Sequence, residues 1–317
     1  MPKIFKPADL RKKIRKPMIT PPFLKKNDTI GIVAPAGKIT EKKITRAIKI
    51  FNQWGLKVEL GRNIYKRKNT FAGNDKQRRD DFQNIIDRED IKAVICARGG
   101  YGTLRIINKI DFKKFRQNPK WIVGFSDITV IHSFLQKNIK CESIHAVMPG
   151  NFPENEMGSK SLNSLKNILF GGKAEYVINS HFQNRQGETE GVLIGGNLSV
   201  LYSLQGTGLE IDTKDKILFI EDVNEYLYHV DRMISNFKLS GKLDNLRGLI
   251  IGQMNRMKDS PVAFGEGAYE ILFRAVEEYN YPVIFNFPAG HIRPNMAIIL
   301  GRKIKMSVDP QTSKIIF

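Results

Sequence analysis

Short apolar runs alternate with amphipathic segments along the first half of this 317-residue chain. Apolar runs at residues 29–34, 56–60, 91–97 and 121–123 predict buried strands, and helical spacing of apolar positions predicts helices at residues 41–54, at residues 76–86 and after residue 126. Repeated alternation of strand and helix favours an open parallel sheet with helices on both faces, a flavodoxin-like α/β domain. In such sheets, sites form at the carboxyl ends of the strands.

The second half of the chain has a different character. Residues 151–187 are richer in Asn, Gly, Ser and Pro around a short predicted helix at residues 161–169, which indicates a linker. Beyond the linker the pattern mixes predicted strands at residues 191–194, 217–220, 248–252 and 282–287 with helices after residue 198 and at residues 228–237 and 268–278, and then closing β structure at residues 298–308. We therefore expect a basic N-terminal arm (1–26), an α/β domain (27–150), a linker (151–187) and a smaller mixed α/β domain (188–317).

The composition is that of a globular protein. Hydrophobic residues make up 41% of the sequence. No apolar stretch approaches the roughly 20 residues that a membrane-spanning helix needs, and the N-terminal arm lacks the apolar segment of a secretory signal peptide. The two cysteines, Cys96 and Cys141, show no spacing typical of zinc or redox sites. We expect a soluble, cytoplasmic protein with no membrane partner.

A net charge of +19 raises the question of nucleic-acid binding. The arm carries nine Lys and Arg residues against the single Asp9, and the remaining excess is spread over many segments without a nucleic-acid motif. The turn at residues 35–37 is neither a dinucleotide fingerprint nor a phosphate loop. We expect no dedicated nucleic-acid site, no cofactor and no metal.

The segment from Trp121 to Thr129 places a serine where a predicted strand turns into a helix. Gly124 permits a sharp turn, and Ser126 would stand at the helix N-terminus, where free backbone N–H groups can hold developing negative charge. The nucleophile elbow of hydrolases has glycine two residues after the serine, whereas this chain has Ile128. Ser126 is therefore either an exposed nucleophile or an N-cap.

A nucleophilic serine needs a base, and the chain has five histidines. His132 lies on the helix that follows the serine, at the wrong azimuth for contact, and is expected to be structural. His181 and His229 lack a setting at a strand end, and His145 is a weaker candidate. His291 follows a buried apolar run and lies in a loop rich in Pro and Gly, which makes it the strongest candidate base among the five, with a structural histidine as the alternative.

The base in turn needs an orienting carboxylate. Glu221 directly ends a predicted buried strand, with Asp222 and Glu225 as close rivals that could instead be exposed acids in the first turn of a helix. Three residues at strand ends, Ser126, Glu221 and His291, thus supply nucleophile, carboxylate and base. Because the serine comes from the first predicted domain and the other two from the second, we expect the site between the domains.

Six motifs occur in a fixed order: IGIVAPAG at residues 30–37, ARGGYG at 97–102, GFSDIT at 124–129, GGNL at 195–198, LFIED at 218–222 with DRM at 231–233, and PAGH at 288–291 with Asn295 and Gly301. In these motifs the chain resembles the serine LD-carboxypeptidases, the muramoyltetrapeptide carboxypeptidases, with the microcin-immunity peptidases as relatives. The resemblance covers about residues 27–302 and leaves out the basic arm.

The resemblance implies site residues that agree with those at the strand ends. It implies Ser126 as nucleophile, His291 as general base and Glu221 as its partner. It also implies an oxyanion hole formed by the backbone N–H groups of Gly100 and Asp127, since glycine lets the backbone approach where a side chain would obstruct.

Substrate-binding candidates border these residues. Gly99 lies in the glycine loop and Asn197 in the GGNL motif, although an ordinary turn and a helix N-cap are the alternatives. An exopeptidase must also hold a terminal carboxylate, which Arg98, Arg232 or Arg293 could bind bidentately rather than form a surface salt bridge.

The chain departs from the family pattern at two places. His145 is followed by Ala146 and Val147, where family members often have His-Gly-Pro, and Ile292 stands where many members have glycine. These departures put local substrate contacts in doubt but remove none of the three implied catalytic residues.

The resemblance implies a cytoplasmic serine carboxypeptidase of peptidoglycan recycling that releases terminal D-alanine from murein tetrapeptides, cleaving after a dibasic third residue. It also implies a homodimer. One alternative is an immunity-type peptidase that cleaves a peptidyl nucleotide with the same triad. The other is a noncatalytic α/β binding protein whose basic arm contacts anionic partners.

Overall fold

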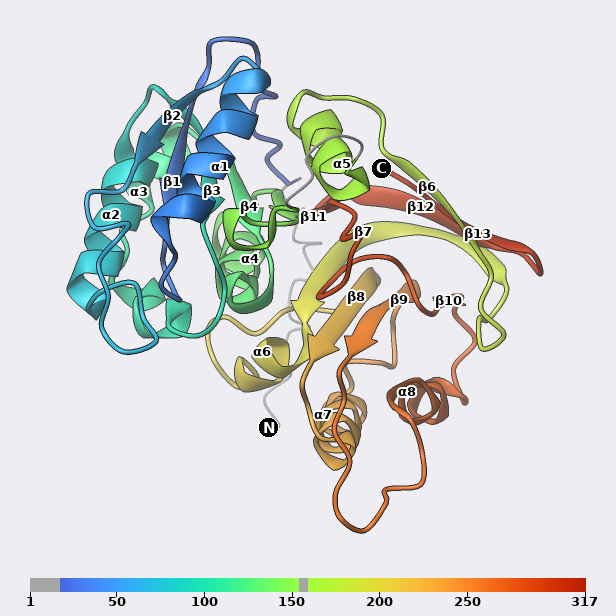
Figure 1. The fold of residues 1–317 in the computed structure, drawn as a ribbon. Coiled ribbons are helices and arrows are strands. Elements are labelled where there is room, and N and C mark those ends of the chain that lie inside the picture. The colour runs from blue at the N-terminus through green and yellow to red at the C-terminus, as the bar shows by residue number, and fades with distance from the viewer. Residues whose placement is uncertain (1–17, 154–158) are drawn as a thin grey trace, which may run out of the picture.

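The computed structural model describes residues 18–153 and 159–317, which form two sheets with helices packed against them (Figure 1). The predicted basic arm lies mostly outside these described residues. No helix within the described ranges is long and apolar enough to cross a bilayer.

The first sheet has the strand order β11-β5-β4-β3-β1-β2. Its strands are β1 (Thr29–Val33), β2 (Lys57–Leu60), β3 (Ile91–Cys96), β4 (Trp121–Gly124), β5 (Ser143–His145) and β11 (Ile298–Leu300). The strands from β2 to β5 pair in parallel, and only β11 is antiparallel to its neighbour. The predicted open parallel sheet is therefore confirmed.

Helices cover both faces of this sheet because each carries an apolar stripe. One core contains residues of α1 (Glu41–Gln53) and α5 (Lys160–Leu169), and the other contains residues of α2 (Asp75–Asp87), α3 (Lys113–Gln117) and α4 (Thr129–Phe134). In α1 the buried residues Ile44, Ala47 and Phe51 recur at helical spacing. The start of α2 is fixed by a capping box between Asn74 and Gln77.

The second sheet has the order β10-β9-β8-β7-β12-β13-β6 and is mixed, as predicted for a mixed α/β fold. Its strands are β6 (Glu175–Asn179), β7 (Gly187–Asn197), β8 (Lys216–Val223), β9 (Gly248–Asn255), β10 (Val283–Ile284), β12 (Lys303–Val308) and β13 (Thr312–Ile316). Strands β7 to β10 are parallel, and β7, β12, β13 and β6 are antiparallel. The parallel part packs against α6 (Leu198–Ser203), α7 (Leu227–Leu239) and α8 (Ala268–Val276).

The chain crosses between the sheets more often than the hydrophobic pattern indicates. The β structure expected at residues 298–308 divides at Gly301, which has a φ of 92°, so that β11 joins the first sheet and β12 the second. Strand β6 lies inside the segment expected as a linker and forms one edge of the second sheet. Arg302, between β11 and β12, forms an ion pair with Glu142 at 2.6 Å, next to β5 of the first sheet, and so links the two sheets. The four-part division of the chain stays a prediction.

A buried arginine fixes the loops that follow β1 and β3. The guanidinium of Arg78 on α2 donates to the carbonyl oxygens of Pro35 (2.6 Å) and Gly102 (2.9 Å) and forms an ion pair with Asp75. A Cβ at position 102 would lie 2.4 Å from Nη1 of Arg78, so glycine is required at this contact.

Replacing Arg78 by methionine is expected to lower the free energy of unfolding by about 2 to 4 kcal/mol, because two buried carbonyl groups lose their donor. Urea denaturation followed by circular dichroism would measure this loss. Arg79→Met is the matched control, since Arg79 lies next on the same helix and, in the described part of the chain, pairs with the neighbouring Asp80 at the surface. Equal stability of the two variants would contradict the structural role of Arg78.

Candidate active site

Ser126 lies at the turn between β4 and α4. It begins a short 3-10 turn over Ser126–Ile128 and has a φ of 63°, a left-handed conformation that is uncommon for residues other than glycine. Phe125, not Ser126, precedes the turn, and no side chain caps it, so the N-cap interpretation of Ser126 is wrong. Ile128 lies against Gly124, where a Cβ would come within 2.9 Å of its side chain. The backbone therefore presents the serine side chain rather than using it as a cap.

The glycine loop after β3 packs against this turn. A Cβ on Gly99 would lie 2.9 Å from the Cβ of Ser126 and 3.1 Å from its Oγ, so a larger residue would press on the hydroxyl. Gly100 has a φ of 109° and lines the same cavity as Ser126. The buried carboxylate of Asp127 accepts the Thr103 N–H at 2.9 Å and ties the serine turn to the glycine loop. The two backbone segments proposed for an oxyanion hole are thus held next to each other.

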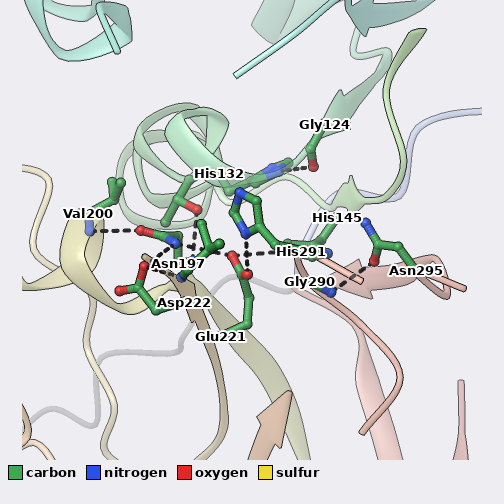
Figure 2. A network of polar contacts seen from close by, with 12 residues as sticks. Gly124, His132, His145, Asn197, Val200, Glu221, Asp222, Gly290, His291 and Asn295 are labelled. Atoms are coloured by element: carbon green, nitrogen blue, oxygen red, sulfur yellow. Dashed lines mark hydrogen bonds and ion pairs between the residues drawn. The ribbon is translucent and has the colours of Figure 1, made fainter. Parts of the chain in front are cut away.

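The buried Glu221 and the half-buried His291 form a pair in the second sheet's part of the site (Figure 2). Nδ1 of His291 lies 2.8 Å from Oε2 of the fully buried Glu221. Since a carboxylate only accepts, this Nδ1 carries the hydrogen, which leaves Nε2 free to face the cavity. Glu221 stands where the register between β8 and β9 shifts, and such irregularities commonly aim side chains at functional sites.

Each of these two groups favours the charged form of the other. Burial alone would raise the pKa of Glu221, but His291 and then His145 lower it to about 2. Burial alone would lower the pKa of His291, but the Glu221 carboxylate outweighs it and raises this pKa above the usual 6.5. The pair is therefore an ionised carboxylate beside a strengthened base.

Asn197 and Asp222 form a hydrogen-bond network next to Glu221, away from the cavity. The side-chain amide of Asn197 donates to Asp222 at 2.9 Å and to Oε1 of Glu221 at 3.3 Å, while its Oδ1 accepts the Val200 N–H and caps α6. Asp222 also accepts the Ser199 N–H at 2.7 Å, and burial followed by repulsion from Glu221 raises its pKa to about 7. Asn197, which the sequence offered as a substrate contact or an N-cap, is a cap that also bonds both carboxylates, and it does not line the cavity.

Ser126 and His291 open into one cavity of about 1100 Å³ between the two sheets. Within the described residues, no hydrogen bond joins these two side chains. The cavity wall includes Arg98 and Arg293, as the sequence indicated, together with Arg256 and Lys160. No described wall residue is an aspartate or glutamate, so the described part of the wall is cationic.

Arg256 is the wall residue that sequence reasoning missed. It follows β9 with a φ of 53°, and its charge opposes protonation of His291. The neighbouring Asn255 donates to the carbonyl oxygen of His291 at 2.8 Å and so connects the two loops. A signal was present, because the apolar run at residues 248–252 ends just before it. Arg232, by contrast, lies over the Tyr228 ring at 5.3 Å and not on the cavity wall.

None of the other four histidines lies on the cavity wall. His132 is buried between the Gly124 carbonyl (2.9 Å) and the Ser143 hydroxyl (2.8 Å), and burial lowers its pKa to about 3, which fits the expected structural role. His229 pairs with Glu225, and His181 packs on aromatic rings. In the described ranges, no group of three or more His, Cys, Asp or Glu residues is placed to hold a metal ion.

Both halves of the chain match models of one protein family. Residues 30–146 match the LD-carboxypeptidase N-terminal domain, and residues 190–306 match the LD-carboxypeptidase C-terminal domain. A probable murein peptide carboxypeptidase of Bacillus subtilis is 32% identical over 298 residues, which are 93% of this chain and 93% of that protein.

A solved structure and a second relative are also similar to this chain. The crystal structure of muramoyltetrapeptide carboxypeptidase from Oxalobacter formigenes superposes with a TM-score of 0.83 and 29% identity, covering 91% of this chain and 98% of that one. The microcin C7 self-immunity protein MccF of Escherichia coli is 26% identical and covers 92% of this chain and 94% of its own length.

Proposed function

Because this chain belongs to the LD-carboxypeptidase family and is therefore a serine-type LD-carboxypeptidase, we propose that it releases the terminal D-alanine of murein tetrapeptides. The observation that carries the mechanism is the shared cavity of Ser126 and His291, with His291 fixed on the buried Glu221. The names of the Bacillus and Oxalobacter relatives support the choice of substrate.

In the proposed reaction, Oγ of Ser126 attacks the carbonyl carbon of the third residue, and Nε2 of His291 takes the hydroxyl proton. The backbone N–H groups of Gly100 and Asp127 bind the resulting oxyanion. The C–N bond then breaks, and His291 returns the proton to the amine of the leaving D-alanine. Water, deprotonated by His291, then attacks the acyl carbon, the bond to Oγ breaks, and His291 returns the proton to Oγ of Ser126. Glu221 orients and stabilises the imidazolium in both halves of the reaction.

The direct test is mass-spectrometric detection of D-alanine released from purified murein tetrapeptide. The native chain is expected to release it, and a tetrapeptide with L-alanine at the last position is the matched control that should stay intact. If the folded protein reacts with a fluorophosphonate at Ser126 but releases no D-alanine, the serine chemistry survives and the proposed substrate is wrong.

The cationic cavity leads to a prediction about the third residue of the peptide. The side chain of diaminopimelate ends in a carboxylate as well as an ammonium group, whereas that of lysine ends in the ammonium group alone, which would meet Arg98, Arg256 and Arg293 without a described acidic partner. We expect kcat/KM to be at least about tenfold higher for the diaminopimelate peptide, a difference of about 1.4 kcal/mol.

Replacing Arg256 by methionine should reduce this preference. Arg232→Met is the matched control, since its guanidinium lies on Tyr228 and away from the cavity wall. Steady-state kinetics on both peptides would decide, and equal use of the two peptides by the native enzyme would refute the charge argument.

The alternative of a peptidyl-nucleotide substrate keeps the same three residues. The likeness to the self-immunity protein over 92% of the chain supports it. Hydrolysis of an aminoacyl sulfamoyl adenosine by the native chain, without release of D-alanine from tetrapeptide, would favour this function. Family membership speaks against the noncatalytic binding protein.

We place the enzyme in the cytoplasm, in peptidoglycan recycling. Cys96 and Cys141 are both buried and free, as suits a reducing compartment. The homodimer stays a prediction, and a single-chain mass from light scattering at micromolar concentration would remove it.

A further inference from the structure

A second histidine lies against the carboxylate of Glu221. His145, at the end of β5, is fully buried, and its Nε2 is 4.0 Å from Oε1 of Glu221 (Figure 2). This distance is too long for a hydrogen bond, and neither ring nitrogen of His145 has another partner in the described structure.

Such a histidine is unusual, because buried polar groups are nearly always hydrogen-bonded. The neighbours of His145 in the sheet offer its ring nitrogens no hydrogen-bond partner other than Glu221. In register it stands opposite Gly124 of β4 and Ile298 of β11, and its ring packs between those of Phe125 (5.6 Å) and Phe219 (5.0 Å).

The carboxylate has room for a further donor. Oε2 accepts a hydrogen bond from His291 at 2.8 Å, whereas among the described residues Oε1 accepts only a long hydrogen bond of 3.3 Å from Asn197. A carboxylate oxygen accepts two hydrogen bonds, so Oε1 is the under-used side of Glu221. The shift needed to form a bond is about 1 Å, and catalytic hydrogen bonds often tighten only when substrate binds.

We propose that His145 is a positioning residue that donates Nε2–H to Oε1 of Glu221 when the cavity is occupied, so that one histidine holds each carboxylate oxygen. The inference rests on the proposed role of Glu221 as partner of His291. The titratable groups around His145 are Glu221 on β8, His291 in the loop after β10, and His132 on α4.

The sign of the effect follows from electrostatics. An N–H dipole aimed at Glu221 offsets part of the carboxylate charge that His291 experiences. Removing this donor leaves the carboxylate more negative, so the pKa of His291 rises further. The reactive, neutral form of His291 then appears only at higher pH, and the loosened carboxylate orients the base less well.

The test measures the rate of fluorophosphonate labelling of Ser126 against pH, which requires no assumption about the natural substrate. His145→Phe keeps an aromatic ring between Phe125 and Phe219 but has no N–H. We expect its labelling midpoint to move to higher pH and its plateau rate to fall at least about tenfold. His145→Gln keeps an amide donor and should recover most of the plateau.

A merely space-filling histidine would give a different result, in which the folded His145→Phe variant shows the native midpoint and plateau. This result would overturn the proposal. In the native protein labelled at Ser126, we also expect a low-field imidazole N–H signal from His145 in proton NMR, besides the signals of His291 and of His132, whose Nε2 donates to the Gly124 carbonyl. Absence of the His145 signal would refute the proposal even if the Phe variant does not fold. Labelling without release of D-alanine would count only against the proposed substrate, whereas no labelling of the native chain would overturn both.

Discussion

Replacing Ser126 by alanine is expected to lower kcat for D-alanine release about a million-fold, because the residue proposed to form the acyl-enzyme is removed. The positive φ of 63° and the close approach of Gly99 place the hydroxyl at the cavity. Among the described residues it forms no hydrogen bond that would stabilise the fold. Stability should therefore change little. The loss would be measured by single-turnover release of D-alanine, and thermal unfolding would verify the fold.

The matched control for this variant is Ser133→Ala. Ser133 lies buried on α4, a few residues further along, and its hydroxyl has no hydrogen-bond partner in the described part of the chain. This variant should retain activity within a few fold. Residual activity of Ser126→Ala above one-hundredth of native would mean that another nucleophile performs the reaction.

The parts of the site that lie at strand ends were predictable from sequence. Ser126, Glu221 and His291 each follow an apolar run, and parallel strands bring such positions to one edge of a sheet. The structure brings Glu221 and His291 into contact and places His291 and Ser126 on one cavity wall. The roles assigned to these residues stay proposals that the variants test.

The residues that surround Glu221 were not predictable in the same way. Asn197, Asp222 and His145 meet Glu221 through pairing between strands and through the register shift at β8, and hydrophobic periodicity does not encode such contacts. From the sequence, Asp222 was therefore a close alternative to Glu221 for the orienting carboxylate. In the structure it accepts hydrogen bonds from Asn197 and from the Ser199 backbone instead. The division of residues 298–308 between two sheets was missed for a related reason, since a positive-φ glycine redirects the chain without interrupting its apolar pattern.

The structure explains why the PAGH motif has glycine directly before His291. Gly290 has a φ of 115°, and a Cβ there would lie 2.6 Å from Oε2 of Glu221. Gly252, on the neighbouring strand, would place a Cβ 3.2 Å from that of Glu221. Glycine at both positions lets the buried carboxylate fit beneath His291.

Replacing Glu221 by glutamine is the second change with a large expected effect, a loss of about 10⁴-fold in kcat for D-alanine release. The amide keeps the volume of the buried side chain but no longer stabilises the imidazolium that forms when His291 takes the serine proton. The protein should remain folded, because Gln can still contact both Asn197 and His291.

The same variant changes the pH profile with a definite sign. In the native enzyme the Glu221 carboxylate raises the pKa of His291, so kcat/KM should fall on acidification with a midpoint above pH 6.5. Without the carboxylate the largest remaining influence is burial, which lowers the pKa of His291, so the acid limb should move to lower pH.

Glu225→Gln is the matched control, because Glu225 was the other acidic candidate and pairs with His229 rather than with His291. This control should keep the native rate and the native acid limb. Profiles of kcat/KM for the native chain and both variants, measured from pH 5 to 9, would test the assignment. An unchanged acid limb in Glu221→Gln would show that Glu221 is not the carboxylate that governs the base.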